Sequence, residues 1–136
     1  MKHKFAGLYL LCVYQSVIVS DTPVNSIHSI PKTDQYVICN RSPILFLVNL
    51  QGQVIRTMTS GKREKGDFIA CALSPRGEWA YAVGEDHTLY CFSLLTGQLE
   101  STLPLSDRAT IGVTHHPHQN MLATYGEDAL LKIWKD

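Results

Sequence analysis

The 136-residue sequence has none of the cysteine patterns that mark disulfide-rich or metal-stabilised domains. It contains four cysteines, without a C-x-x-C pair or another spacing typical of a zinc cluster. A disulfide framework needs more cysteines in a shorter chain. Each cysteine lies in an apolar run, where a reduced thiol behaves as a small hydrophobic side chain; the four are Cys12, Cys39, Cys71 and Cys91. The cysteine content therefore favours a protein of a reducing compartment.

The sequence also lacks an excess of charge of either sign. Twelve basic residues balance twelve acidic ones, so no general attraction toward nucleic acid or an anionic membrane is expected, and only a local basic patch is left open. The sequence contains no G-x-S-x-G motif, no cysteine–histidine pairing typical of a nucleophile and no carboxylate pair at a meaningful spacing. It therefore predicts neither an enzyme nor a cofactor site.

No segment has the apolar stripe of 3.6-residue period that is typical of a helix. What the sequence has is a repeat: Pro31, Pro75 and Pro117 each end a run of alternating apolar residues, at separations of 44 and 42 residues. Each proline is followed by a polar turn, a second apolar run, a tight-turn cluster and a third run. In the first two copies, a glycine-containing turn then leads to a fourth run. Short runs separated by turn residues predict a four-stranded antiparallel meander.

The period of this repeat lies within the roughly 40–45 residues of one β-propeller blade. The sequence therefore predicts an all-β fold, a partial β-propeller of about three four-stranded antiparallel blades. We expect the blades at about 21–60, 61–104 and 105–136, the last of them without its fourth strand. Repeat folds of this kind commonly bind partners through their loops and concave surfaces.

The turn between the second and third runs carries the same three residues twice, as Gly84-Glu85-Asp86 and Gly126-Glu127-Asp128, and Ser42 takes the aspartate's place in the first copy. The glycine is expected to relieve the backbone where the turn needs a positive φ. The aspartate can accept hydrogen bonds from turn N–H groups, and a large side chain at the end of the third run can wedge between neighbouring blades. The residues predicted to make these turns and blade contacts are Gly84, Asp86, Phe92, Gly126, Asp128 and Trp134.

The last four residues, Ile133-Trp134-Lys135-Asp136, follow the second of these turns and resemble the signature of WD40 repeats. The second copy departs from that signature, with Phe92-Ser93 in place of Trp-Asp. All three copies lack the Gly-His pair that usually opens a WD40 repeat.

Three stretches go beyond generic WD40 sequence: "SGKRE" (60–64), "CALSPRGEW" (71–79) and "HHPHQN" (115–120). With them, residues 21–136 resemble the C-terminal WD40-repeat region of the Smu-type (suppressor-of-mec-and-unc) family of spliceosomal WD40 proteins. The resemblance implies a seven-bladed propeller of which the last three blades are present here. It also implies a protein–protein interaction scaffold of the pre-mRNA splicing machinery, in the nucleus, whose partners are other proteins such as spliceosomal factors.

Other functions stay open beside this one. Direct contact with RNA is not decided by the resemblance. An enzyme built on a propeller would need several polar residues pointing into the central channel, where the first runs instead supply small apolar residues (Ala70, Ala72 and Gly112). A secreted β-repeat binding protein is the other alternative, suggested by the N-terminal residues.

Residues 1–20 do not share the resemblance. A basic start precedes an apolar stretch that Gln15 and Ser16 interrupt, too short and too broken for a membrane span. Three interpretations stay open: a β-strand, a false start of translation, or a signal-like segment. Residues 7–19 are the candidate strand for completing the last blade or pairing with the first. Without closure, blade faces and strand edges stay exposed, so we expect the isolated chain to be oligomeric or marginally stable.

His115, His116 and His118 form the run most suggestive of a metal site. Alternation along a strand sends neighbouring side chains to opposite faces, and zinc normally also takes thiolate or carboxylate ligands from elsewhere. The run therefore favours a role in a turn, and no metal site is predicted.

A small basic loop lies between the first and second blades, at Lys62, Arg63 and Lys65. Such a loop is usually a solvated surface. Its functional interpretation is a candidate partner-binding loop, in contact with an acidic protein segment or with RNA phosphate.

Overall fold

The computed structural model describes residues 2–5, 8–11, 16, 18, 20–106 and 108–136. Its regular elements in this part of the chain are β-strands, which confirms the all-β prediction. They are β1 (Lys2–Phe5), β2 (Leu8–Leu11), β3 (Val24–Ser29), β4 (Tyr36–Asn40), β5 (Ile44–Val48), β6 (Val54–Thr59), β7 (Phe68–Leu73), β8 (Trp79–Gly84), β9 (Thr88–Ser93), β10 (Leu99–Pro104), β11 (Thr110–His115), β12 (Met121–Gly126) and β13 (Leu131–Lys135). A helix long and apolar enough to cross a membrane is not found among the described residues.

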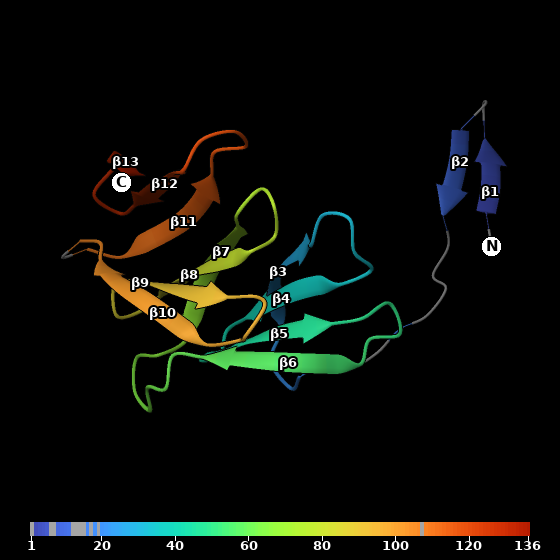
Figure 1. Ribbon diagram of the computed structural model, residues 1–136, viewed down its shortest axis with the longest axis horizontal. Coiled ribbons are helices and arrows are strands. Elements are labelled where there is room, and N and C mark those ends of the chain that lie inside the picture. Colours follow the sequence, from blue (N-terminus) through green and yellow to red (C-terminus); the bar gives the residue numbers. More distant parts are fainter. Residues whose placement is uncertain (1, 6–7, 12–15, 17, 19, 107) are drawn as a thin grey trace.

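Three antiparallel sheets form the body of the chain (Figure 1). The strand order is β3-β4-β5-β6 in the first sheet, β7-β8-β9-β10 in the second and β11-β12-β13 in the third. The inner strands β3, β7 and β11 lie next to one another, and each sheet runs outward from its inner strand. This is the arrangement of consecutive propeller blades.

The three sheets repeat one pairing register. Each pairing of a first with a second strand shifts register near the start of the first strand, and such a bulge increases the local twist of the sheet. The second and third strands pair residues that the sequence repeat aligns. These equivalent pairs are Tyr36–Val48, Ala80–Phe92 and Leu122–Trp134.

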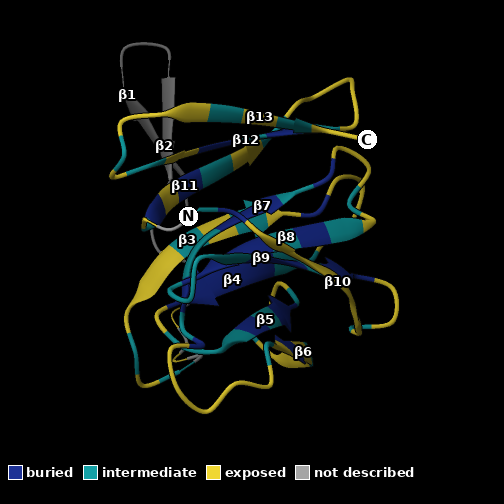
Figure 2. Cartoon of the chain, turned by 90° about the vertical axis from the view of Figure 1, so that its left-hand side faces the viewer, coloured by how far each residue is buried: buried dark blue, intermediate teal, exposed yellow. Residues whose placement is uncertain are grey.

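Apolar side chains are buried where one sheet packs on the next. We call the contact between the first and second sheets seam 1 and that between the second and third sheets seam 2. Figure 2 shows the buried residues concentrated on the middle strands β4, β8 and β9, whereas β10 is exposed along its length. The largest fully buried side chains of seam 1 are Tyr90, Phe68, Phe92, Leu45 and Met58. Seam 2 is smaller and contains Val83, Leu89, Leu105 and Leu122, with the partly buried Trp134 packed against them.

The strands β1 and β2 form a separate two-stranded hairpin, away from the three sheets in Figure 1. Leu8–Leu11, part of the predicted closing strand 7–19, thus pairs with Lys2–Phe5 and not with an edge of the first or third sheet. The prediction of a closing strand is wrong for this part. Pairing two strands that are adjacent in sequence closes a short loop, and this costs less conformational entropy than pairing with the edge of a distant sheet. The predicted strand's residues 7, 12–15, 17 and 19 lie outside the described residues.

Candidate functional site

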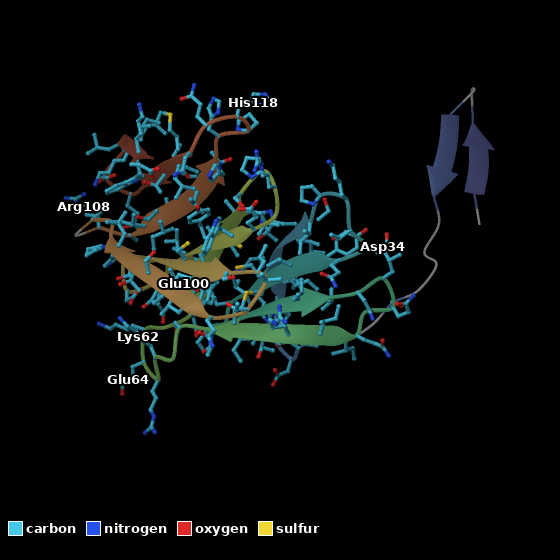
Figure 3. All side chains as sticks on the ribbon, in the orientation of Figure 1. Asp34, Lys62, Glu64, Glu100, Arg108 and His118 are labelled. Atoms are coloured by element: carbon cyan, nitrogen blue, oxygen red, sulfur yellow. The ribbon has the colours of Figure 1, made fainter. Side chains whose placement is uncertain are left out.

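The connections between strands form two rims, because each sheet is a meander whose turns alternate between its ends. We define the first rim by residues 41–43, 60–67, 85–87, 105–106, 108–109 and 127–130, and the second rim by residues 30–35, 49–53, 74–78, 94–98 and 116–120. Figure 3 shows Lys62, Glu64 and Arg108 along the first rim and Asp34 on the opposite side. Both Gly-Glu-Asp turns and the basic loop therefore lie on the first rim.

The turn from β8 to β9 is connected to the loop that precedes its own sheet. One carboxylate oxygen of Asp86 accepts a hydrogen bond from the Thr88 N–H (3.3 Å) and the other from the Tyr90 hydroxyl (2.5 Å). Lys62, on the loop between β6 and β7, donates to this second oxygen and forms an ion pair with it. The Asp86 side chain is only 10% exposed, against 47% for Lys62. Asp86 therefore joins the turn, the third strand and the inter-sheet loop.

The turn from β12 to β13 has the same arrangement with different partners. Asp128 accepts a hydrogen bond from the Leu130 N–H (3.2 Å) and one from the Ser106 hydroxyl (3.5 Å), and it pairs with Lys132 at 3.6 Å. Ser106 lies on the loop between β10 and β11, which corresponds to the loop of Lys62 between β6 and β7, and Lys132 is the repeat equivalent of Tyr90. The cation and the hydroxyl have thus exchanged places between loop and strand, while the carboxylate keeps its position.

The corresponding turn of the first sheet uses a hydroxyl in place of the carboxylate. Ser42 Oγ accepts a hydrogen bond from the Ile44 N–H (3.2 Å) and donates to the side-chain oxygen of the buried Asn40 (2.5 Å). Beside it, Arg41 pairs with Glu85 of the second sheet at 3.4 Å. The first rim is therefore connected across seam 1 by side chains of both sheets.

Gly84 and Gly126 do not have the positive φ that the sequence predicted. The left-handed residues of these turns are His87 (φ 63°) and Ala129 (φ 60°). The glycines are required for space instead: a Cβ on Gly84 would lie 2.5 Å from Asp86 Oδ1, and one on Gly126 would lie 2.5 Å from the carbonyl oxygen of Ala109. The turns therefore need glycine because neighbouring atoms approach the backbone, and the predicted reason is wrong.

The contacts of Asp86 fix the protonation of its neighbours. Burial raises the pKa of Asp86, but the hydrogen bonds from Lys62 and Tyr90 outweigh it, so the pKa lies below that of an ordinary aspartate. The hydrogen bond to Asp86 raises the pKa of Lys62. Burial, followed by the hydrogen bond to Asp86, raises the pKa of Tyr90. At neutral pH the carboxylate and the ammonium are charged and the phenol is neutral, as these hydrogen bonds require.

Replacing Asp86 by asparagine is expected to destabilise the chain by about 1 kcal/mol at pH 7, because one of two acceptor oxygens and a partly solvated ion pair are lost. Since the folded-state pKa is lowered, this stabilisation is present above the unfolded-state pKa and disappears as the pH falls through the folded-state value. The free energies of unfolding of D86N and wild type, measured in urea, should therefore differ at pH 7 and converge as the pH falls below about 4. D34N, in an exposed turn of the second rim, is the control and should show no difference. A difference between the two free energies of unfolding that persists unchanged at low pH would contradict the prediction.

Phe92 and Trp134 occupy equivalent places in seams 1 and 2. Phe92 is fully buried in seam 1. Trp134 is partly buried in seam 2, and its indole Nε1 donates a hydrogen bond to Thr124 Oγ1 at 2.9 Å. Each ring lies on the side of its sheet that faces the preceding sheet, between the two.

The histidine run shapes the turn between β11 and β12. His116 Nδ1 accepts hydrogen bonds from the N–H groups of His118 (3.0 Å) and Gln119 (3.1 Å). The ring of His115 lies 5.6 Å from that of Tyr81, measured between centroids. A group of three or more side chains able to hold a metal ion is not found in the described ranges.

Comparison with known proteins gives these sheets a family context. No protein-family model matches the sequence. The sequence is 38% identical over 120 residues to the WD40 repeat-containing protein smu1 of Dictyostelium discoideum, a match that covers 88% of this chain and 22% of that protein. Among the solved structures that share the fold are two with a TM-score of 0.72 each. They are the WD40 β-propeller domain of Doa1 (21% identity, 85% of this chain and 37% of that one) and the β-propeller domain of Myceliophteria thermophila Cps50 (Swd1) (17% identity, 83% and 38%).

The sheets are WD40 propeller blades. The resemblance of the sequence to the Smu-type WD40 protein is confirmed as well. The chain spans about a fifth of the length of the curated relative that it matches, 22%. The WD40 fold therefore applies to the chain itself, whereas the activity of the whole relative can be transferred only as a proposal.

Within this WD40 structure, the basic loop does not act as one unit. Lys62 is paired with Asp86. Arg63 and Lys65 are exposed, and the described residues include no ion-pair partner for either. A contact between this loop and an acidic partner would therefore depend on Arg63 and Lys65.

Trp79 lies between two grooves of the second WD40 rim and was not singled out by the sequence. The groove between the second and third blades has a volume of about 600 Å³ and is also lined by Arg76, Tyr81 and His118. The groove between the first and second blades has about 500 Å³ and is lined by Trp79 and Leu95 among others. Tryptophan, tyrosine and arginine are the residues enriched at the energetic centres of protein interfaces. The signal in the sequence was a tryptophan placed directly after a turn, at the start of a strand.

Proposed function

We propose that this chain is a protein-interaction scaffold of the pre-mRNA splicing machinery and acts in the nucleus. The observation that carries the proposal is the 38% identity to smu1, which extends over 120 residues, 88% of this chain. The scaffold role is supported by the WD40 fold as well. The splicing role and the nuclear location rest on the Smu-type resemblance alone.

The arrangement of the two rims supports the binding of partner proteins, and we assign no catalytic role to their residues. On the first rim, the carboxylates of Asp86 and Asp128 are occupied by turn N–H groups and neighbouring side chains. On the second rim, the grooves beside Trp79 present aromatic and basic groups to a partner. The partners we propose are spliceosomal proteins, and the candidate residues for a contact with an acidic segment or with RNA phosphate are the exposed Arg63 and Lys65.

Affinity purification of the tagged 136-residue chain from nuclear extract, with quantitative mass spectrometry, tests the splicing role. Spliceosomal proteins should be enriched over an unrelated propeller of similar size, and the enrichment should survive ribonuclease treatment. Absence of spliceosomal proteins from the bound fraction would overturn the proposal. If ribonuclease removed the whole enrichment of spliceosomal proteins, the chain would be held to the spliceosome by RNA and not by direct protein contacts.

Reversing two charges of the basic loop, R63E/K65E, is expected to weaken partner binding about tenfold at low salt, because both side chains are exposed and a charged contact at a rim mainly steers association. The control is K32E, which reverses the charge of an exposed lysine on the second rim that lines neither groove beside Trp79. Binding should be measured by biolayer interferometry at two salt concentrations. Equal affinities of R63E/K65E and wild type for the partner would show that the loop is a solvated surface without a role in binding.

A further inference from the structure

The groove of the second rim between the first and second blades has a volume of about 500 Å³. The first blade contributes Ile30 to its lining, and the second blade contributes, among others, Glu78, Trp79, Leu94 and Leu95. All the lining residues lie within positions 30–95, and each of the two blades has four strands. The groove is therefore formed by two neighbouring blades and does not depend on the residues near either end of the chain.

Hydrogen bonds across seam 1 hold this groove in its shape. Arg56, on β6, donates from Nη1 to the carbonyl oxygens of Leu94 (2.8 Å) and Leu95 (2.6 Å) in the turn between β9 and β10. Gly97 of the same turn leaves room for the arginine, because a Cβ there would overlap the Arg56 side chain. The Leu94 N–H donates to the carbonyl oxygen of Glu78 at 3.0 Å. The groove is therefore preformed, and a preformed surface loses less conformational entropy when a partner binds.

Leu95 presents an apolar side chain to solvent at this fixed position. It is 82% exposed, although the arginine holds its backbone in place. Covering it with an apolar side chain of a partner removes apolar surface from water, which favours binding. Trp79 lines the same groove and is half-buried, and tryptophan is enriched at the energetic centres of interfaces. The groove therefore offers a fixed apolar surface to a side chain of a partner.

The charge of the groove is negative. Among the residues that the structure describes, Glu78 is the one charged residue in its lining, and it is exposed without an ion-pair partner. A carboxylate here repels nucleic-acid phosphates and acidic side chains and attracts a lysine or an arginine. The attracted cation can also stack on the indole of Trp79. The groove between the second and third blades differs, because Arg76 lines it together with Glu78.

We propose that the groove between the first and second blades binds a short segment of a partner protein in which a large apolar residue lies next to an arginine or a lysine. The apolar side chain covers Leu95 and Trp79, and the cation pairs with Glu78. This inference rests on the scaffold function proposed above and deepens it, because it gives the scaffold one docking site and one class of partner segment. RNA and acidic segments do not fit this groove, because its charge repels them.

Selection of peptides tests the chemistry of the bound segment without a known partner. A phage library of random short peptides is first depleted on the variant L95E, which removes peptides that bind elsewhere, and is then selected on the full 136-residue chain. The enriched peptides should combine a large apolar residue with an adjacent arginine or lysine. The same selection on E78K should return acidic residues in place of the basic ones. If no peptide is enriched, or if both chains enrich the same basic peptides, the proposal is wrong.

Titration calorimetry with one selected peptide tests the position of the binding site. L95A and E78K should each raise the dissociation constant about tenfold, since one removes apolar contact and the other reverses the charge. Both side chains are exposed, so the variants should fold like the wild type, which urea unfolding checks. The matched control is R76E, because Arg76 lies on the same turn as Glu78 and lines only the neighbouring groove. R76E should not weaken binding. Weaker binding in R76E with unchanged binding in E78K would place the peptide in the neighbouring groove and refute the proposal.

The purification from nuclear extract, repeated with L95E and E78K, separates a failure of this inference from a failure of the proposed function. At least one spliceosomal protein that the wild type binds should be lost from both variants. Equal recovery of all of them would overturn the groove as a docking site and leave the scaffold role intact. Absence of spliceosomal proteins from the wild type, together with peptides that bind in the groove, would overturn the splicing role alone.

Discussion

Truncating Phe92 to alanine is expected to lower the free energy of unfolding by about 3–5 kcal/mol. Its side chain is fully buried in seam 1 and lies edge-on to Phe68, with ring centroids 6.0 Å apart. The nearby Tyr90 ring is stacked at 6.5 Å from it. Removing the ring leaves a cavity between two blades, which the paired strands on both sides cannot collapse to fill. Since domains of this size are stable by only about 5–15 kcal/mol, much of the stability would be lost.

Urea unfolding at a fixed protein concentration measures this effect, because self-association would make the midpoint depend on concentration. F92L keeps most of the volume and should cost about a third as much. L95A, at an exposed position, should cost less than about 0.5 kcal/mol. A loss in F92A no larger than that in L95A would mean that the two blades do not pack through Phe92.

Truncating Trp134 to alanine is expected to cost about 2–3 kcal/mol, below the roughly 3–5 kcal/mol of a fully buried aromatic residue, because the indole is only partly buried. Two contributions add up in this loss. The ring packs against Leu122, Leu89 and neighbouring apolar side chains of seam 2. Its Nε1 donates to Thr124 Oγ1 at 2.9 Å, a hydrogen bond of about 1 kcal/mol.

Two further variants separate these contributions. W134F keeps ring packing and loses the hydrogen bond, and T124V removes the acceptor while keeping the shape of the side chain. Both should cost about 1 kcal/mol, and the double variant should cost less than their sum if the bond couples them. Thermal or urea unfolding followed by circular dichroism avoids the change in tryptophan fluorescence. Additive losses would show that the hydrogen bond contributes nothing to stability.

The strands were predictable because two independent signals agree in this sequence. Alternating apolar runs give the period of a strand, and proline, glycine and asparagine or aspartate residues end each run. The predicted runs before Pro31, Pro75 and Pro117 became β3, β7 and β11. A repeat also aligns each position with two others, so that the weak first copy could be interpreted from the other two.

The side-chain partners of the turns were not predictable in the same way. Asp86 was expected to accept N–H groups of its own turn, and it does so at Thr88. Its contact with Lys62 joins residues 24 positions apart, and their meeting depends on how one blade packs on the next. Lys62 was therefore assigned to a solvated or partner-binding loop together with Arg63 and Lys65. A sequence pattern reports local geometry and says little about contacts between blades.

The glycines show a second limit of prediction from the sequence. Gly84 and Gly126 were recognised as obligatory, but the reason could be conformational or steric, and residue type alone does not separate the two. The positive φ belongs to His87 and Ala129, and alanine is not a residue type enriched in that conformation. The predicted closing strand failed for a similar reason, since an apolar run such as Leu8–Leu11 pairs with whichever strand is nearest.

The unequal size of the two seams has a consequence for how the molecule opens. Seam 1 is filled by aromatic and aliphatic side chains from both blades, whereas seam 2 has a smaller buried cluster flanked by partly exposed residues. Separating the third blade from the second thus requires less free energy than separating the second from the first. We therefore expect sub-global fluctuations to release β11–β13 as one cooperative unit, so that its amide hydrogens exchange with solvent while those of the first two blades remain protected.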